Sequence, residues 1–396
     1  MSRQEMTKIS DLDEVLHRIE SEPLEAVSAR EASAFDESAA PFSEKLVLFG
    51  AGPLGKGTLA GLRRGGVEPL AFADNNPRIW GKEIDGLIVL SPNEANAHHG
   101  DSACFVVTVY NGSTVRRQLD TLGCRKVAPF PLLFWKYSDI FTPNSGIDLP
   151  HRLRAAIDDI RSCDSILCDD RTQRELREQV AWRYWLDYEM LSPPFDGKHT
   201  YFPLDLLEPL QSEVFVDCGS FDGDSLHSFA EHWGGRFGHA FAFEPDPANR
   251  AALRLTIERM QLGDRATIMP YAVGNLNGAV SFVNSASAGS HFASDSGGST
   301  VKCRKLDDID WPMAPTYIKM DIEGAELEAL RGAAETLRRH QPILAICTYH
   351  RSEHLWQVPN LIHSINPEYR IFLRRYAEEC WEGVCYAVPA HRLKQA

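Results

Sequence analysis

The residues best suited to chemistry lie in Val214–Ser225, where the sequence reads VFVDCGSFDGDS. An apolar run ends at Asp217, and an acidic turn containing Gly219 and Gly223 follows. A helix should then start near Asp224 or Ser225, either of which could cap it. A strand that ends in a glycine turn before a helix brings backbone N–H groups close to a ligand. The acidic side chains of this turn would repel a pyrophosphate, so they favour a ligand with positive charge and no phosphate. S-adenosylmethionine carries a sulfonium and an ammonium group and meets both conditions.

Two more carboxylates follow later apolar runs. Glu244 ends the run FAFE, where a carboxylate can accept hydrogen bonds from both hydroxyls of a ribose. Asp321 comes directly after the run YIKM, with Glu323 and Glu326 close behind it. Because the carboxyl ends of parallel strands share one edge of a sheet, we expect these groups near the same ligand. The alternative for each is a structural role as a helix cap.

Methyl transfer from a sulfonium is an in-line displacement, and an alcohol acceptor benefits from a general base. The candidate catalytic residues are Asp321, His350, which follows the apolar run ending in ICTY, and His291, in a Ser-rich segment. Either histidine could instead be structural. Asp321, Glu323 and His350 could also hold a divalent ion, but their spacing defines no metal motif. We therefore predict a site without metal.

A second glycine turn lies near the N-terminus. Gly50, Gly52 and Gly55 follow the apolar run LVLF in a GxGxxG pattern, and Asp74 ends the next apolar run. This arrangement is typical of a dinucleotide site. Three interpretations remain open: an anchor for a nucleotide sugar, a structural module without ligand, and a nicotinamide site.

The bulk composition narrows the class of protein. A net charge of −14 over 396 residues argues against broad nucleic-acid or anionic-membrane binding. The chain starts without an apolar signal core, and no run approaches the ~18 apolar residues of a membrane span. Nine scattered cysteines indicate a reducing compartment rather than a disulfide framework. These features predict a cytoplasmic protein.

Strand and helix patterns predict an α/β chain with four parts. We expect a helical or flexible segment at 1–44 and a small Rossmann-like domain at 45–140, with strands at LVLF, before Asp74, at Leu87–Leu90 and at Cys104–Thr108. A helical bridge with a lid-like loop should follow at 141–211, and a seven-stranded doubly wound domain, whose last two strands could form a hairpin, at 212–396. The first segment has apolar residues at helical spacing and could pack on the body or on a second copy in a homo-oligomer.

The C-terminal part resembles the FkbM family of S-adenosylmethionine-dependent methyltransferases. The resemblance is carried, in order, by VDCGSFDGDS, FEPDPANRAAL, AVGNLNG, KLDDI and YIKMDIEGAELEALRGA. It implies that Asp217 and its glycines line the methionine half of the cofactor, that Glu244 binds the ribose, and that Asp321 faces the methyl group. It also places Ala272 and Val273 near the adenine. The candidate cofactor-binding residues are Asp217, Gly219, Ser220, Phe221, Gly223, Asp224, Ser225, Glu244, Pro245, Asp246, Ala272, Val273 and Asp321.

The family resemblance leaves the acceptor open. Many members have Ala-Asn where this chain has Ser220-Phe221, so the contacts at the methionine tail differ here. The N-terminal turn resembles small nucleotide- or sugar-nucleotide-handling domains. We expect O-methylation of a hydroxyl on a sugar, a glycosylated molecule or a polyketide-like product. The alternative is a nucleotide-binding or scaffolding protein, or a bifunctional enzyme that uses NAD(P) at the N-terminal turn.

Overall fold

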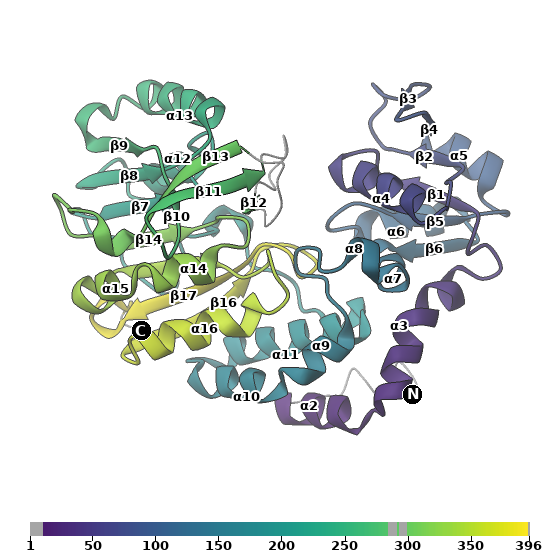
Figure 1. The fold of residues 1–396 in the computed structure, drawn as a ribbon, viewed down its shortest axis with the longest axis horizontal. Helices are drawn as coiled ribbons and strands as arrows, with labels where there is room; N and C mark the ends of the chain where they lie inside the picture. Colours follow the sequence, from purple (N-terminus) through teal and green to yellow (C-terminus); the bar gives the residue numbers. More distant parts are fainter. Residues whose placement is uncertain (1–10, 284–290, 293–298, 395–396) are drawn as a thin grey trace. The chain divides into compact units, whose positions relative to one another are not determined.

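The computed structural model describes residues 11–283, 291–292 and 299–394, and the chain divides into two compact units (Figure 1). Each unit gathers segments that are distant in the sequence. The N-terminal unit comprises residues 1–157, 177–193 and 377–381, and the C-terminal unit comprises residues 158–176, 194–376 and 382–396.

The N-terminal unit contains a six-stranded sheet in the order β3-β4-β2-β1-β5-β6. All neighbouring strands are parallel except β3, which pairs antiparallel with β4. The sequence patterns had indicated β1, β2, β4 and β5 but neither of the edge strands. The strands are β1 (Leu46–Phe49), β2 (Ala71–Ala73), β3 (Glu83–Ile84), β4 (Leu87–Leu90), β5 (Cys104–Val107) and β6 (Lys126–Pro129).

Successive residues of β1 enter two different cores, as expected for a sheet covered on both faces. Leu46 and Leu48 pack in one apolar cluster, and Val47 and Phe49 pack in the other. The helices of this part are α2 (Leu12–Ser21), α3 (Leu24–Ala39), α4 (Pro53–Arg64), α5 (Pro92–His99), α6 (Ser113–Leu122), α7 (Phe130–Lys136), α8 (Ser138–Phe141) and α9 (Pro150–Ala155).

The predicted N-terminal amphipathic helix corresponds to α2. Asp11 caps it by accepting a hydrogen bond from the Glu14 N–H, and the apolar residues of its inner face are buried. The following helix α3, whose pattern the sequence analysis did not identify, packs on α7 and β6. Two further helices, α10 (Ile157–Ile166) and α11 (Asp170–Trp185), follow α9.

The C-terminal unit contains the predicted seven-stranded sheet, in the order β16-β17-β15-β14-β7-β8-β9. The five strands from β15 to β9 are parallel to one another, and β17 runs antiparallel between β15 and β16. The last two strands form the hairpin that the sequence had suggested. The strands are β7 (Val214–Cys218), β8 (His239–Phe243), β9 (Ala266–Met269), β14 (Tyr317–Met320), β15 (Ile343–Cys347), β16 (Tyr369–Arg375) and β17 (Gly383–Pro389).

A second, four-stranded sheet interrupts this alternation, in the order β10-β13-β11-β12. Its strands are β10 (Ala272–Val273), β11 (Gly278–Val283), β12 (His291–Phe292) and β13 (Ser299–Arg304). Helices α14, α15 and α16 pack together, with α16 against β16 and β17 (Figure 1). The helices of this unit are α12 (Asp224–His232), α13 (Pro247–Arg259), α14 (Glu326–Arg331), α15 (Ala334–His340) and α16 (His354–Ile365).

Aromatic side chains dominate the core of the C-terminal unit. The Phe215 ring in β7 stacks on Phe229 of α12, with ring centroids 4.3 Å apart. Phe202, from the segment that we expected to be a lid-like loop, is completely buried and contacts both the Phe215 and Tyr317 rings. This segment is therefore anchored in the core, which fixes the neighbouring Tyr201.

The thiol groups form no disulfide. All nine cysteines lie in the described part of the chain, and eight are buried while Cys168 is exposed. Within the described residues, none of the helices has both the length and the apolar character that crossing a bilayer requires.

Candidate active site

The turn after β7 touches the turn after β14. Gly219 has φ +82°, and a Cβ at this position would lie 2.0 Å from the Asp321 carbonyl oxygen. The N–H groups of Gly219 and Ser220 both donate to the Phe243 carbonyl at the end of β8, at 3.0 Å. Only glycine fits this conformation and this space. The carboxyl ends of β7, β8 and β14 therefore meet at one point.

Glu244 ties the β8 end to the same glycine turn. It is 5% exposed, and its Oε2 accepts a hydrogen bond from the Phe221 N–H at 3.0 Å. Its Oε1 accepts one from the Asp246 N–H at 2.8 Å. Burial raises the pKa of Glu244, although these N–H groups act in the opposite direction. The carboxylate is thus held in a fixed orientation beside Phe221, whose side chain is 49% exposed.

The helix starts differ in part from the prediction. We expected Asp224 or Ser225 to cap the helix after the glycine turn, but α12 begins at Asp224, with Gly223 at φ +92° in the cap position. The Asp224 carboxylate instead accepts a hydrogen bond from the neighbouring Ser225 N–H. At the next helix the cap is Asp246, through the N–H groups of Ala248 and Asn249, and not Glu244, for which a cap was the alternative. Pro245 and Pro247 lie on either side of Asp246.

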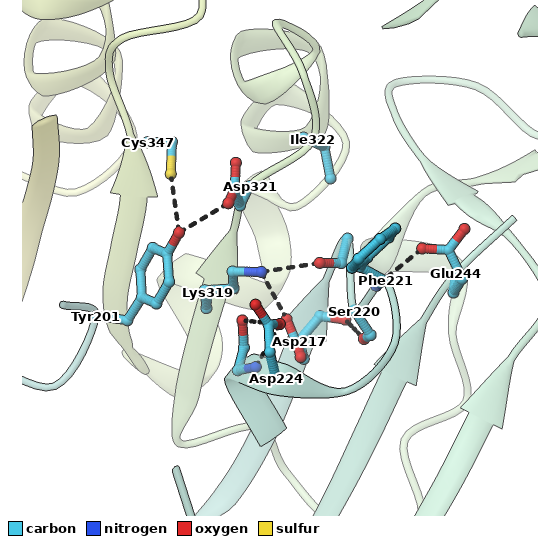
Figure 2. Close-up of polar contacts among 12 residues, drawn as sticks. Tyr201, Asp217, Ser220, Phe221, Asp224, Glu244, Lys319, Asp321, Ile322 and Cys347 are labelled. Atoms are coloured by element: carbon cyan, nitrogen blue, oxygen red, sulfur yellow. Dashed lines mark hydrogen bonds and ion pairs between the residues drawn. The ribbon is translucent and has the colours of Figure 1, made fainter. Parts of the chain in front are cut away.

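Asp217 forms a buried ion pair that the sequence analysis missed. Its Oδ1 lies 3.0 Å from the Lys319 Nζ, and both side chains are at most 1% exposed. Lys319 also donates to the Gly219 carbonyl at 2.9 Å, so it joins β14 to the glycine turn (Figure 2). The charge of Asp217 is therefore compensated within the protein, whereas the sequence suggested an uncompensated acidic turn.

The pair is ionised at neutral pH. Burial raises the pKa of Asp217 to about 6, although the Lys319 ammonium favours its charged form. Burial disfavours the charged form of Lys319, but Asp217 and Asp321 raise its pKa above the ordinary value. Both oxygens of Asp217 are buried and neither has a hydrogen bond within the described part of the chain, the contact of Oδ1 with Lys319 being an ion pair.

Asp321 receives hydrogen bonds from two tyrosines. The Tyr201 hydroxyl donates to Oδ2 at 2.7 Å (Figure 2). The Tyr349 hydroxyl donates to Oδ1 at 3.3 Å. The His350 Nε2 lies 3.2 Å from the same Oδ1. Burial alone would raise the pKa of Asp321, but His350, Lys319 and Tyr201 outweigh it and hold the pKa below its ordinary range.

His350 lies in a buried series of alternating carboxylate and imidazole groups. Its Nδ1 lies 2.8 Å from Glu326 Oε1, and the other oxygen of Glu326 lies 3.2 Å from the His354 Nδ1. Burial disfavours a charged imidazole, but Glu326 and Asp321 raise the pKa of His350 well above its ordinary value. The surrounding carboxylates therefore favour the charged form of His350, which in turn favours the negative charge on Asp321.

Glu323 lies in the turn between β14 and α14. Its φ of +57° places it in the left-handed region, which is uncommon for a residue with a side chain. Its Oε2 lies 3.5 Å from the His350 Nε2, and the side chain is 26% exposed. Burial, together with Asp321 and Glu326, raises the pKa of Glu323 to about 7, although His350 acts in the opposite direction.

The remaining candidates lie in other elements. Ala272 and Val273 are buried in β10, which pairs with β13. His291 lies in β12, but its side chain is outside what the structure describes. Among the described residues, His, Cys, Asp and Glu side chains form no group of three or more placed to hold a metal. The contacts of His350 are ion pairs with carboxylates.

The N-terminal glycine turn is closed by its own acidic residue. Asp74 Oδ2 accepts a hydrogen bond from the Ala51 N–H at 2.8 Å, and its Oδ1 accepts one from the Asn76 N–H at 2.8 Å. Gly50 has φ +112°, and a Cβ on Gly55 would lie 1.8 Å from the Gly50 carbonyl oxygen. The space around Gly52 is open. Both oxygens of Asp74 thus hold the turn itself.

Lys319, Tyr201 and Tyr349 were missed for different reasons. Lys319 interrupts the apolar run YIKM, and in the sheet it stands directly beside Asp217 in the register of β14 on β7. A lysine inside a strand expected to be buried was therefore a usable signal. Tyr349 adjoins His350 and shares its strand end. No local pattern marks Tyr201, which reaches Asp321 from 120 residues away in the sequence.

Comparison with known proteins agrees with this geometry. Residues 217–379 match the Methyltransferase FkbM domain. A 153-residue stretch is 34% identical to the hexuronic acid methyltransferase AglP of Haloferax volcanii, covering 36% of this chain and 59% of the relative. The chain thus spans less than two thirds of that relative.

A solved structure extends the likeness to nearly the whole chain. The methyltransferase FkbM from Methylobacillus flagellatus KT is 26% identical, covers 91% of this chain and 93% of its own, and superposes with a TM-score of 0.70. The matched domain begins at Asp217 and includes the Gly219 turn, Glu244, Lys319 and the Asp321 turn. The chain therefore carries a methyltransferase domain of the FkbM family.

Proposed function

We propose that this protein transfers a methyl group from S-adenosylmethionine to a hydroxyl group. The observation that carries the proposal is the meeting of the Gly219 turn, Glu244 and the Asp321 turn at the carboxyl ends of adjacent parallel strands. Ligands of open α/β sheets bind at this edge. The family of the domain supports the same reaction.

The residues at this edge suit the charges of S-adenosylmethionine. The buried Oδ2 of Asp217 lacks a hydrogen bond in the described structure and can accept one from an ammonium group. Glu244 is ordered by two backbone N–H groups and retains lone pairs for the ribose hydroxyls. Lys319 neutralises Asp217 and leaves the site less acidic than its sequence suggests.

We further propose a sugar hydroxyl as the acceptor. The support is the relative AglP, which is named a hexuronic acid methyltransferase. When bound, the cofactor supplies an electrophilic methyl group, and the protein has to align the acceptor oxygen with it. Asp321, held by Tyr201 and Tyr349, would orient the acceptor hydroxyl, and His350 would keep Asp321 ionised.

For the N-terminal unit we propose a part in acceptor binding rather than in methyl donation. Gly50, Gly52, Gly55 and Asp74 form a turn at the start of α4 that suits a nucleotide-like group. Asp74 accepts two backbone N–H groups, as Glu244 does, and likewise retains lone pairs for the hydroxyl groups of such a ligand.

Calorimetry on the full chain tests the cofactor. We expect S-adenosylmethionine and S-adenosylhomocysteine to bind and NADH not to bind. Mass spectrometry after incubation with hexuronic acids and their nucleotide-linked forms would then detect a product heavier by one methylene. Binding of NADH without S-adenosylmethionine would contradict the proposal.

A further inference from the structure

Three carboxylates lie in or beside the turn after β14, and they differ in how many donors already occupy them. Glu326 is completely buried between two imidazoles, and its Oε1 also accepts the Ile322 N–H at 3.0 Å. Asp321 is partly exposed, but both of its oxygens receive tyrosine hydroxyl groups. Hydrogen bonds to a carboxylate stabilise its charged form and make it a weaker base.

Glu323 is the carboxylate of this group that is open to an acceptor. Its side chain is 26% exposed, and within the described part of the chain it has an ion-pair contact to His350 at 3.5 Å and no hydrogen bond. The turn that carries it adjoins the Gly219 turn, because the Asp321 carbonyl fills the space beside Gly219. Glu323 therefore lies two residues from the point where the cofactor site is proposed.

We propose that Glu323 is the catalytic base, which accepts the proton of the acceptor hydroxyl while Asp321 orients that hydroxyl. The inference rests on the proposed function. A lone pair of the acceptor oxygen forms the new O–CH₃ bond, and the electron pair of the C–S bond returns to sulfur. The acceptor proton passes to the Glu323 carboxylate and then to solvent. The products are the methyl ether, the demethylated thioether and one proton.

The surroundings of Glu323 suit this role. His350 and Lys319 favour its charged form, whereas burial, Asp321 and Glu326 favour its protonated form. These opposing influences leave its pKa at about 7, where a base can both take up and release a proton at neutral pH. Asp321, whose pKa is held below its ordinary range, is the weaker base of the two.

The first part of the test uses turnover. Glu323→Gln, Asp321→Asn and a control, Glu335→Gln, are compared with wild type using S-adenosylmethionine and D-glucuronic acid as the probe acceptor. Glu335 pairs with Arg338 on the exposed surface of α15, outside the site. We expect Glu323→Gln to lower kcat by ~10²–10⁴-fold, as for loss of a positioned base. Its affinity for S-adenosylmethionine, measured by calorimetry, should stay within twofold of wild type.

The pH profile separates a base from a positioning residue. Wild type should lose kcat below about pH 7, and Asp321→Asn should keep this limb at a lower pH because the Asp321 charge raises the pKa of Glu323. Glu323→Gln should lose the dependence. Near-wild-type turnover in Glu323→Gln, or a pH limb that disappears in Asp321→Asn instead, would overturn the assignment.

A measurement without acceptor completes the test. Difference infrared spectroscopy of wild type against Glu323→Gln should show a carboxyl group that titrates near neutral pH. The same carboxyl group should still be present in Asp321→Asn, with a lower pKa. If wild type binds S-adenosylmethionine but leaves the probe unmethylated, absence of this titrating carboxyl would still overturn the role of Glu323. If wild type does not bind S-adenosylmethionine, the proposed function fails first, and the assignment fails with it.

Discussion

The two glycine turns of this protein are built by the same device. In each, a carboxylate at the end of the second strand accepts a hydrogen bond from a backbone N–H in the turn, 23 residues earlier: Ala51 to Asp74, and Phe221 to Glu244. Each carboxylate also accepts the N–H two residues beyond itself. The motif and its spacing therefore indicate how the turn is held in place, and they do not identify the ligand that binds there.

The difference lies in the neighbouring strand. β5 stands beside β1 as β14 stands beside β7, so Thr108 and Asp321 occupy equivalent positions. Their N–H groups donate to the Phe49 and Cys218 carbonyls respectively, and their own carbonyls crowd Gly50 and Gly219. Thr108 is buried, and its hydroxyl donates to backbone carbonyls. Asp321 is partly exposed and lies beside the titratable His350.

The two turns thus differ in the residues at the ends of β5 and β14. These residues, rather than the glycine motif, determine which reactive side chains lie beside each turn. The C-terminal turn has Lys319 and the charged Asp321 turn beside it, and the N-terminal turn has the neutral Thr108 at the place of Asp321. Four measurements test this difference between the two glycine turns.

The largest effect is expected from Lys319→Met. It leaves Asp217 as a buried charge without its partner, and breaking such a pair costs about 3–5 kcal/mol of unfolding free energy. Urea unfolding at pH 7.5 would measure this loss. The double variant Asp217→Leu/Lys319→Met removes both charges and should recover a large part of it. A single variant as stable as wild type would show that the pair does not hold the two strands together.

The second effect is a pH dependence of stability at Glu323. Its pKa is raised from 4.5 to about 7 in the folded protein, so the fold favours the protonated form. The stabilisation that the protonated Glu323 gives the folded protein is fully present below pH 4.5 and is lost as the pH rises to about 7. At 1.36 kcal/mol per pH unit, this interval corresponds to ~3 kcal/mol.

Unfolding free energies of wild type and Glu323→Gln between pH 4.5 and 8 would test this. The unfolding free energy of wild type minus that of the variant should fall by that amount as the pH rises. Asp217, whose raised pKa changes stability in the same direction, is present in both proteins, so its effect cancels in this difference. A difference that does not change with pH would show that Glu323 titrates in the folded protein as it does in the unfolded chain.

The third measurement compares Glu244 with Asp74, the carboxylates that hold the two glycine turns. Glu244→Gln should weaken S-adenosylmethionine binding by about 1.5–3 kcal/mol, at least tenfold in Kd, because a charge-assisted hydrogen bond to the ribose is lost. Asp74→Asn is the matched change in the N-terminal turn and should leave this Kd unchanged. Equal effects of the two variants would mean that both turns contribute to one cofactor site.

The fold was largely predictable because its signals are local. Short apolar runs separated by helical patterns predicted the seven-stranded sheet, including the β16–β17 hairpin. The edge strands β3 and β6 were missed. β3 has only two residues, neither of them buried, and β6 ends in a proline at the start of a helix. Edge strands are buried on fewer sides, so their apolar pattern is weak.

The candidate site was less predictable because its partners come from distant segments. The sequence placed Asp217, Glu244 and Asp321 at strand ends, and the structure brings the turns that carry them together. It did not reveal that Lys319 compensates Asp217, because periodicity shows burial but not which charges become neighbours. From the sequence, Asp321 was a candidate for both catalysis and cofactor binding. The two tyrosine hydroxyl groups that donate to its oxygens could not be foreseen.

The smallest effect is expected from Tyr201→Phe, which tests how Asp321 is held. The change removes the 2.7 Å hydrogen bond to Oδ2, while the buried Phe202 next to it keeps the segment in place. Asp321 retains Tyr349 and His350, so we expect kcat to fall by up to about tenfold, or ~1.4 kcal/mol, with little change in KM.

Tyr349→Phe is the matched control for this change, because its hydrogen bond to the same carboxylate is longer, at 3.3 Å. Its effect on kcat should be smaller than that of Tyr201→Phe. If Asp321 only orients the acceptor, both variants should keep the pH dependence that we assign to Glu323. If instead Tyr201→Phe shifted the limb of the kcat profile, the hydroxyl would be setting the charge of the reacting base. The proton would then have to be assigned to Asp321, and the difference between the two glycine turns would rest on that one residue.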